Sequence, residues 1–97
     1  MLAEARSCIK RYTSDEARAD SELVIVDTRS ADERDRDGVI PGSKHVPLSV
    51  LPWRTADLEG RRVCLVCAHG YSSSLAAALL VELGVDAGDL IGGYEAW

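Results

Sequence analysis

The chain has 97 residues, enough for one small domain with a single hydrophobic core and too few for two. It carries 11 Lys and Arg against 16 Asp and Glu, a net charge of -5, whereas nucleic acids and anionic membranes favour clustered positive charge. We therefore expect no nucleic-acid partner and no membrane partner, but a small molecule or a protein. The longest apolar run, Leu75 to Val81, is far below the roughly 20 residues of a membrane-spanning helix.

The cysteine content indicates the compartment. Three cysteines, an odd number, occur in a chain whose N-terminus lacks the apolar core of a signal peptide. This pattern does not suggest a secreted disulfide framework. We expect a soluble protein of the reducing cytoplasm.

The first half of the chain predicts short elements. Thr13 and Glu16 have the spacing of a capping box, which begins a helix. The run Leu23 to Val26 is continuously apolar rather than alternating, as in parallel strands buried on both faces. The elements expected here are a helix over Met1 to Cys8, an edge strand over Ile9 to Tyr12, a helix from Thr13 to Ala19, a strand over Leu23 to Val26, a helix over Ser30 to Arg36 and a brief strand over Lys44 to Val46.

The second half alternates strands and helices in the same way. The segment Ser73 to Leu83 is almost entirely apolar and ends at Gly84, which predicts a largely buried helix with Leu75, Leu79 and Leu83 on one stripe. Alternation of this kind is typical of an α/β fold with a mostly parallel sheet. The other elements expected here are a helix over Ser49 to Ala56, a strand over Arg62 to Val66, a strand over Asp89 to Ile91 and a helix over Tyr94 to Trp97.

Cys67 lies at the carboxyl end of a predicted strand, where ligands bind in open parallel sheets. Small and turn-forming residues follow it around Gly70, so several backbone N–H groups can point at its sulfur. A helix terminus contributes about 0.3 to 1 kcal/mol, up to about 2 when partly buried, whereas lowering a thiol pKa by about two units requires roughly 2.7 kcal/mol. A thiolate nucleophile at Cys67 therefore needs direct N–H contacts; the alternative is an ordinary buried cysteine.

Cys64 and Cys67 form a Cys-x-x-Cys pattern, but neither a redox pair nor a metal site is expected. Cys64 falls within the strand, and residues three apart on a strand face opposite sides of the sheet. No second cysteine pair is present to complete a zinc site. We expect Cys64 and Cys8 to be structural.

Other polar residues have two interpretations each. His69 either attracts an anionic substrate or tunes the thiol, or it faces solvent. The segment Asp27 to Arg29 borders the same pocket if the two central strands are neighbours, and a carboxylate with a guanidinium there braces loops more often than it performs chemistry. We assign no role to His45 and interpret Arg34 to Asp37 as a solvated face.

Four segments, in matching order along most of the chain, together resemble the rhodanese family of sulfurtransferases. They are Asp27-Thr28-Arg29, Gly38-Val-Ile-Pro-Gly-Ser43, the loop from Cys67 to Ser73 with its helix, and Gly92-Gly93-Tyr94-x-x-Trp97. The resemblance implies a single rhodanese-like domain over residues 1–97. Its fold is a five-stranded, mostly parallel sheet flanked by helices on both faces, with the strand before Cys67 central and next to the strand ending at Asp27.

The resemblance also implies a reaction. Cys67 would take a sulfane sulfur from thiosulfate, a persulfide or a polysulfide and pass it to cyanide or a thiol, without a cofactor or a metal. Covalent catalysis divides one hard step into two, and the loop N–H groups stabilise charge on sulfur in both. A sulfur-relay protein is a further candidate partner. The implied substrate-binding residues are Ala68, His69, Gly70, Tyr71, Ser72 and Ser73, with Asp27 and Arg29 in support.

The chain departs from the common family pattern at three positions. Ala68 and Ser72 occupy places that are basic in many active members, and Val39 replaces a frequent His. We therefore hypothesise that the loop attracts the thiosulfate dianion less well than a persulfide, polysulfide or protein-bound donor. Two alternatives stay open: a phosphatase or arsenate reductase, which needs a loop one residue longer that closes with Arg, and a binding or regulatory module without turnover.

Overall fold

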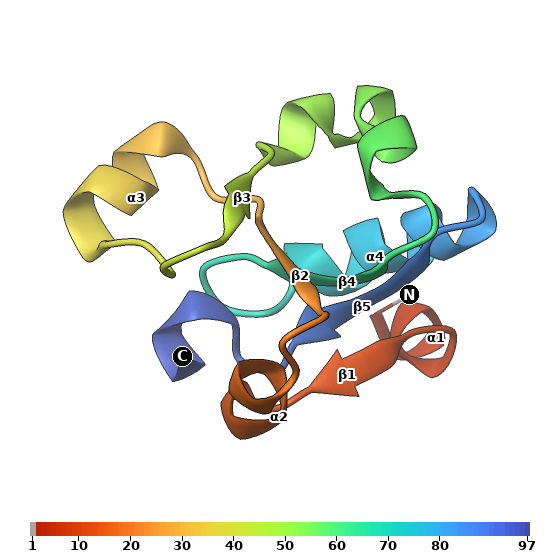
Figure 1. Cartoon of the computed structure of the whole chain (residues 1–97), viewed down its shortest axis with the longest axis horizontal. Helices are drawn as coiled ribbons and strands as arrows, with labels where there is room; N and C mark the ends of the chain where they lie inside the picture. Colours follow the sequence, from red (N-terminus) through yellow and green to blue (C-terminus); the bar gives the residue numbers. More distant parts are fainter. Residues whose placement is uncertain (1) are drawn as a thin grey trace.

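The structure is a computed structural model that describes residues 2–97, so Met1 of the first expected helix lies outside the described part. Five strands form one sheet in the order β1-β5-β4-β2-β3, with every neighbouring pair parallel (Figure 1). The elements are α1 (Leu2–Ser7), β1 (Lys10–Tyr12), α2 (Ser14–Ala19), β2 (Val24–Asp27), α3 (Ala31–Asp37), β3 (Lys44–His45), the 3₁₀ helices η1 (Leu48–Trp53) and η2 (Thr55–Leu58), β4 (Arg62–Val66), α4 (Ser72–Glu82), β5 (Asp86–Leu90) and the 3₁₀ helix η3 (Gly93–Ala96).

The expected architecture is confirmed. The strand before Cys67, β4, is central and pairs with β2, with Asp27 opposite Val66. The first strand, β1, lies at the edge and pairs only with β5 among the strands of residues 2–97. Because all strands run parallel, their carboxyl ends share one edge of the sheet, and the segments that follow β2 and β4 meet there.

Side chains cover both faces of the sheet. Val63 and Leu65 of β4 point to one face, whereas Cys64 and Val66 point to the other, as the two-residue period of a strand requires. The first face packs against α4, η1 and η2, and its cluster contains Leu51, Leu58, Ala76, Ala77, Leu80, Val85 and Ala87. The second face packs against α2 and η3, and its cluster contains Ala17, Leu23, Ile40 and Leu90 with Tyr94 and Trp97 beside it.

Capping boxes fix the starts of two helices. The Thr13 hydroxyl accepts the Glu16 N–H at 3.2 Å while the Glu16 carboxylate accepts the Thr13 N–H at 2.9 Å, as expected at α2. Ser30 and Glu33 repeat the arrangement at α3, a second capping box that we did not predict. Reciprocal hydrogen bonds of this kind satisfy N–H groups that a helix start leaves free.

The prediction that the helix over Ser73 to Leu83 is largely buried is wrong. Leu75, Leu79 and Leu83 are 42%, 44% and 50% exposed. The small residues of α4 face the sheet instead, because they allow the helix to approach β4 and β5 closely, and the leucine stripe is left on the outside. The buried residues of α4 are Ser73, Ser74, Ala76, Ala77 and Leu80.

Two other predictions need correction. The segment Ser49 to Ala56 is not one helix, because η1 ends at Trp53 and contains Pro52, which has no N–H to donate. The last strand begins at Asp86 and ends at Leu90, whereas we expected Asp89 to Ile91. Its first residues are poor strand formers, and pairing with β1 and β4 overrides that propensity. Among the helices of residues 2–97, none combines the length and the hydrophobicity that a membrane span requires.

Candidate active site

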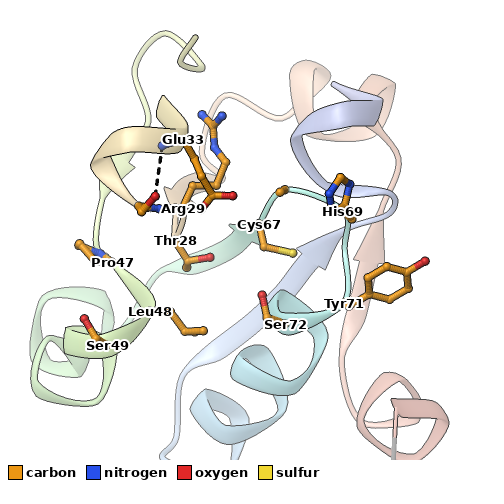
Figure 2. Close-up of a pocket in the computed structure, with 12 residues that line it drawn as sticks. Thr28, Arg29, Glu33, Pro47, Leu48, Ser49, Cys67, His69, Tyr71 and Ser72 are labelled. Atoms are coloured by element: carbon orange, nitrogen blue, oxygen red, sulfur yellow. Dashed lines mark hydrogen bonds between the residues drawn. The ribbon is translucent and has the colours of Figure 1, made fainter. Parts of the chain in front are cut away.

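A pocket of about 420 Å³ opens at the carboxyl edge of the sheet, with Cys67 in its wall. In Figure 2 the Cys67 side chain lies to the right of Thr28, which follows β2, and above Ser72, which begins α4. The Cys67 residue is only 6% exposed, so reactants reach the sulfur through this pocket. The lining residues are Thr28, Arg29, Ser30, Glu33, Pro47, Leu48, Ser49, Cys67, Ala68, His69, Tyr71 and Ser72.

Hydrogen-bonding groups surround the Cys67 sulfur. The Gly70 N–H donates to Sγ at 3.0 Å, and the Ser73 hydroxyl lies 3.3 Å from Sγ. Burial by itself raises the pKa of Cys67, but hydrogen bonds from Ser73, Ser72 and Gly70 outweigh it and hold the pKa below its ordinary value. The site therefore favours the thiolate, which is the nucleophilic form.

Contacts with η3 fix the curl of the loop. The Tyr94 N–H donates to the Cys67 carbonyl at 2.7 Å, and the Glu95 N–H donates to the Ala68 carbonyl at 3.2 Å. In a planar trans peptide the C=O and the following N–H point in opposite directions, so the N–H groups of Ala68 and His69 point away from η3. Gly93, with φ of +68°, makes this approach possible because a Cβ there would overlap the Cys67 carbonyl.

A buried carboxylate lies beneath the loop. Asp89, on β5, is fully buried and accepts hydrogen bonds from the hydroxyls of Ser73 at 3.1 Å and Ser74 at 2.6 Å. Arg11 of β1 binds the same carboxylate through Nε at 2.9 Å and Nη2 at 3.3 Å. From α1, Arg6 donates to the Gly70 carbonyl at 3.0 Å and to Ser74 Oγ at 3.1 Å. The first two elements of the chain thus support the loop from below.

The Asp27 and Arg29 side chains form a buried pair beside the pocket. Arg29 donates to Asp27 through Nε at 3.0 Å and Nη2 at 2.7 Å, and Nη2 also reaches the Gly38 carbonyl at 2.8 Å. The guanidinium stacks on the Tyr94 ring at 3.8 Å. Arg34 approaches Asp27 at 3.2 Å, so the interpretation of Arg34 to Asp37 as a purely solvated face is wrong at its first residue. Asp27 itself does not line the pocket.

The predicted site residues divide into two groups. Ala68, His69, Tyr71 and Ser72 line the pocket, whereas Gly70 and Ser73 are buried and contact the sulfur. His69 is exposed, as the solvent-facing interpretation expected, and its Nδ1 lies 2.8 Å from the Glu95 carboxylate; attraction of an anionic substrate or tuning of the thiol stays a prediction. Figure 2 shows the Tyr71 ring directed away from the sulfur.

The other two cysteines differ from Cys67. Cys64 is fully buried on the second face of the sheet, where burial and the nearby Asp89 raise its pKa to about 12. It is therefore an unreactive core thiol, in line with the structural role expected for it. Cys8 is exposed after α1, so the expectation that it is structural is wrong.

Sequence reasoning missed several residues around the site. Arg6 reaches Gly70 across 64 positions of the chain, Arg11 reaches Asp89 across 78, and Asp89 reaches Ser73 across 16, separations that no local pattern reveals. His45 received no role, yet its Nε2 lies 2.7 Å from the Arg29 carbonyl. One feature of the sequence points weakly to Asp89. It is an acidic residue in a predicted short strand, and a carboxylate that is buried there needs hydrogen-bonding or charged partners.

Comparison with known proteins places these features in a family. Residues 13–97 match the family model described as the rhodanese-like domain. The chain belongs to this family. The family expected from the four sequence segments is thereby confirmed, and its matched residues include Cys67, the loop and Gly92-Gly93 but exclude α1 and β1.

Two curated relatives of this rhodanese-like chain are named sulfurtransferases. Thiosulfate sulfurtransferase GlpE of Stutzerimonas stutzeri is 38% identical over 93 residues, which cover 91% of this chain and 84% of that protein. The tRNA sulfurtransferase of Aliivibrio salmonicida is 37% identical over 68 residues, 66% of this chain. The matched part is only 14% of that larger enzyme.

Solved structures share the fold along almost the whole chain. One from Rhodopseudomonas palustris, described as a protein of unknown function and possible tyrosine phosphatase, has a TM-score of 0.91 and 32% identity, with 99% of this chain and 84% of that one covered. A rhodanese-like domain protein from Staphylococcus aureus has a TM-score of 0.84 and 30% identity, with 92% and 91% covered.

Proposed function

We propose that this chain is a sulfurtransferase in which Cys67 accepts a sulfane sulfur, holds it as a persulfide and passes it to a thiophilic acceptor. The observation that most strongly supports this function is the position of the Cys67 sulfur in the pocket, 3.0 Å from the Gly70 N–H and 3.3 Å from the Ser73 hydroxyl. The relatives named sulfurtransferases support the same reaction class. Because its strands build one sheet, we further propose that the chain works as a single domain.

The reaction consists of two displacements on sulfur. In the first, the Cys67 thiolate attacks the outer sulfur of the donor and forms a new S–S bond. The donor's own bond to that sulfur breaks, and its electron pair stays with the rest of the donor, which for thiosulfate is released as sulfite. In the second, an acceptor thiolate or cyanide attacks the outer sulfur of the Cys67 persulfide, and the Cys67 thiolate leaves. Hydrogen bonds from Gly70 and Ser73 stabilise the thiolate before the first step and after the second.

The remaining residues position the sulfur and the substrate. Ala68, His69, Tyr71 and Ser72 contact the donor as it enters the pocket, and the acceptor uses the same opening. The buried pair Asp27 and Arg29 braces the loop region through Gly38 and Tyr94 rather than reacting. No cofactor or metal takes part in this scheme.

The charge of the pocket favours donors with little negative charge. Its residues include no lysine, and Arg29 is neutralised by Asp27 while Glu33 adds a negative charge. We expect methanethiosulfonate, a monoanion, to be a better donor than the thiosulfate dianion. Ala68→Lys should raise kcat/KM for thiosulfate about tenfold through electrostatic attraction, and should raise it less for methanethiosulfonate.

Steady-state kinetics with both donors measures this preference, and Ala68→Gln, which adds length without charge, is the matched control. Comparable kcat/KM for the two donors in the parent protein would contradict the preference. Equal gains for both donors in Ala68→Lys would contradict its electrostatic cause.

The initial-rate pattern tests the proposed function itself. A sulfur carried on the enzyme predicts double displacement, so double-reciprocal plots at several fixed acceptor concentrations should be parallel. Intersecting lines would show that donor and acceptor react in one complex, against a persulfide carrier. Absence of turnover with every donor would favour a non-catalytic module. Hydrolysis of an aryl phosphate would favour the phosphatase alternative, for which the residues between Cys67 and α4 offer no Arg.

A further inference from the structure

The carboxylate of Asp89 poses an electrostatic problem for the proposed thiolate. It is fully buried and lies at most two hydrogen-bond lengths from the Cys67 sulfur, with Ser73 between them. A negative charge so close disfavours ionisation of the thiol. Something in the fold must offset it if Cys67 is to be a thiolate.

Ser73 lies between the Cys67 thiol and the Asp89 carboxylate and has one hydroxyl proton to donate. A serine hydroxyl donates a single hydrogen bond, and Ser73 Oγ lies 3.1 Å from Asp89 Oδ2 and 3.3 Å from Cys67 Sγ. With a neutral thiol, the S–H donates to Ser73 and Ser73 donates to Asp89. Once the thiol has released its proton to solvent, the hydroxyl must rotate toward the sulfur, and Asp89 loses one donor.

Arg11 compensates Asp89 for the lost hydrogen bond from Ser73. The Arg11 guanidinium donates two hydrogen bonds to the Asp89 carboxylate, at 2.9 and 3.3 Å, and so brings a positive charge next to it. Ser74 donates to the same carboxylate at 2.6 Å. Asp89 therefore keeps charged and neutral donors when Ser73 turns away. A bidentate arginine is well suited to this because it neutralises the carboxylate and fixes its orientation.

Arg6 acts on the other donor to the sulfur. It holds the Gly70 carbonyl at 3.0 Å and Ser74 Oγ at 3.1 Å, while the Gly70 N–H donates to Cys67. Both arginines lie on α1 and β1, before the residues 13–97 that match the family. Their charge reaches the site from beneath the loop, where it supports the sulfur and leaves the pocket opening without an added cation.

We propose that Arg11 and Arg6 are positioning residues that keep Cys67 ionised, Arg11 by neutralising Asp89 and freeing the Ser73 hydroxyl, and Arg6 by holding Gly70. This role concerns the same Cys67 sulfur and rests on the proposed function of sulfur transfer. The charged groups facing the loop and its pocket from the packed elements are Arg6 on α1, Arg11 on β1, Arg29 after β2, Glu33 on α3, His69 in the loop, Asp89 on β5 and Glu95 on η3.

The test is the pH dependence of Cys67 alkylation by iodoacetamide, followed by intact mass. The parent for all variants is Cys8→Ser, because Cys8 is exposed and would also react. In Arg11→Gln the apparent pKa of Cys67 should rise by about one to two units, since Asp89 is left uncompensated. Arg11→Lys should restore most of the shift, and the double variant Arg11→Gln/Asp89→Asn should return the pKa toward the parent value.

Two further variants serve as a second test and as a charge control. Arg6→Gln should raise the pKa of Cys67 in the same direction but less, and it remains informative if Arg11→Gln does not fold. Arg18→Gln removes one positive charge on α2, where Arg18 stacks on Trp97, and should leave the pKa unchanged. Circular dichroism and thermal melting establish that each variant is folded.

Unchanged pKa values in folded Arg11→Gln and Arg6→Gln would overturn the proposal. So would a double variant whose pKa stays as high as that of Arg11→Gln. The titration needs no sulfur donor, so its outcome is independent of the proposed function. A protein that takes up no sulfur but shows the expected shifts would refute the sulfurtransferase and retain the arginine effect.

Discussion

Gly93→Ala should lower kcat/KM for sulfur transfer by about 100-fold or more while leaving the sheet intact. A Cβ at position 93 would overlap the Cys67 carbonyl oxygen and lie 2.7 Å from the Gly70 nitrogen, and φ of +68° disfavours any side chain. The loop must move away from η3, which removes the Gly70 N–H from the sulfur. Loss of one preorganised donor to a reacting charge costs about 10² to 10³ in rate.

The control for this prediction is Gly60→Ala. Gly60 also has a positive φ, +76°, but a Cβ there would have no heavy atom within 4 Å, so only the backbone strain is reproduced. We expect its activity to stay near the parent value. A Gly93→Ala protein with parental kcat/KM would contradict the view that the contact between η3 and the loop sets the site.

Asp27→Asn should lower the free energy of unfolding by about 3 to 5 kcal/mol, the usual cost of removing one partner from a buried charge pair. Arg29 is as deeply buried as Asp27 and would lose its compensating charge, and Arg34 would lose its contact with Asp27 as well. For a domain of this size such a loss lowers the melting temperature by at least about 12 °C. Denaturant unfolding and thermal melting both measure the effect.

Asp37→Asn is the matched control, because the pair of Asp37 with Arg36 is exposed. Exposed pairs contribute little, so this variant should unfold almost as the parent does. Similar destabilisation by both substitutions would show that charge burial at Asp27 is not the cause.

The stability contributed by Asp27 should also depend on pH. Burial raises the pKa of Asp27, but hydrogen bonds from Arg29 and the charges of Arg29 and Arg34 outweigh it and hold the pKa below its ordinary value. A carboxyl whose pKa is lower in the folded state stabilises the fold above its unfolded pKa, about 3.9 for Asp, and loses that effect as the pH falls through the folded pKa. The stability difference between the parent and Asp27→Asn should therefore shrink below about pH 4, and a constant difference would contradict this origin.

The sequence predicted those parts of the fold that local chemistry decides. The capping box at Thr13, the apolar run of β4 and the Gly84 stop after the last long helix all act over a few residues, and the structure has an element at each. Burial of the α4 stripe was mispredicted because apolarity does not reveal which side of a helix faces the sheet. On α4 the small residues and Leu80 face inward, where the helix packs against β4 and β5.

The candidate site was predictable from one segment and hidden in others. Cys67 and its loop follow a strand and begin a helix, which is a local pattern. Arg11 meets Asp89 because β1 pairs with β5, and Arg6 reaches the loop because α1 packs against α4. Pairing between distant strands is a tertiary property, so no spacing in the sequence pointed to the arginines.

Intact mass after treatment with thiosulfate, methanethiosulfonate or polysulfide tests the central claim most directly. The parent protein should gain the mass of one sulfur atom and lose it when cyanide or a thiol is added. Cys64→Ser, which alters only a buried core thiol, should behave as the parent does, and Cys67→Ser should gain nothing. A parent protein that gains no sulfur, or a Cys67→Ser protein that gains it as readily, would contradict the account.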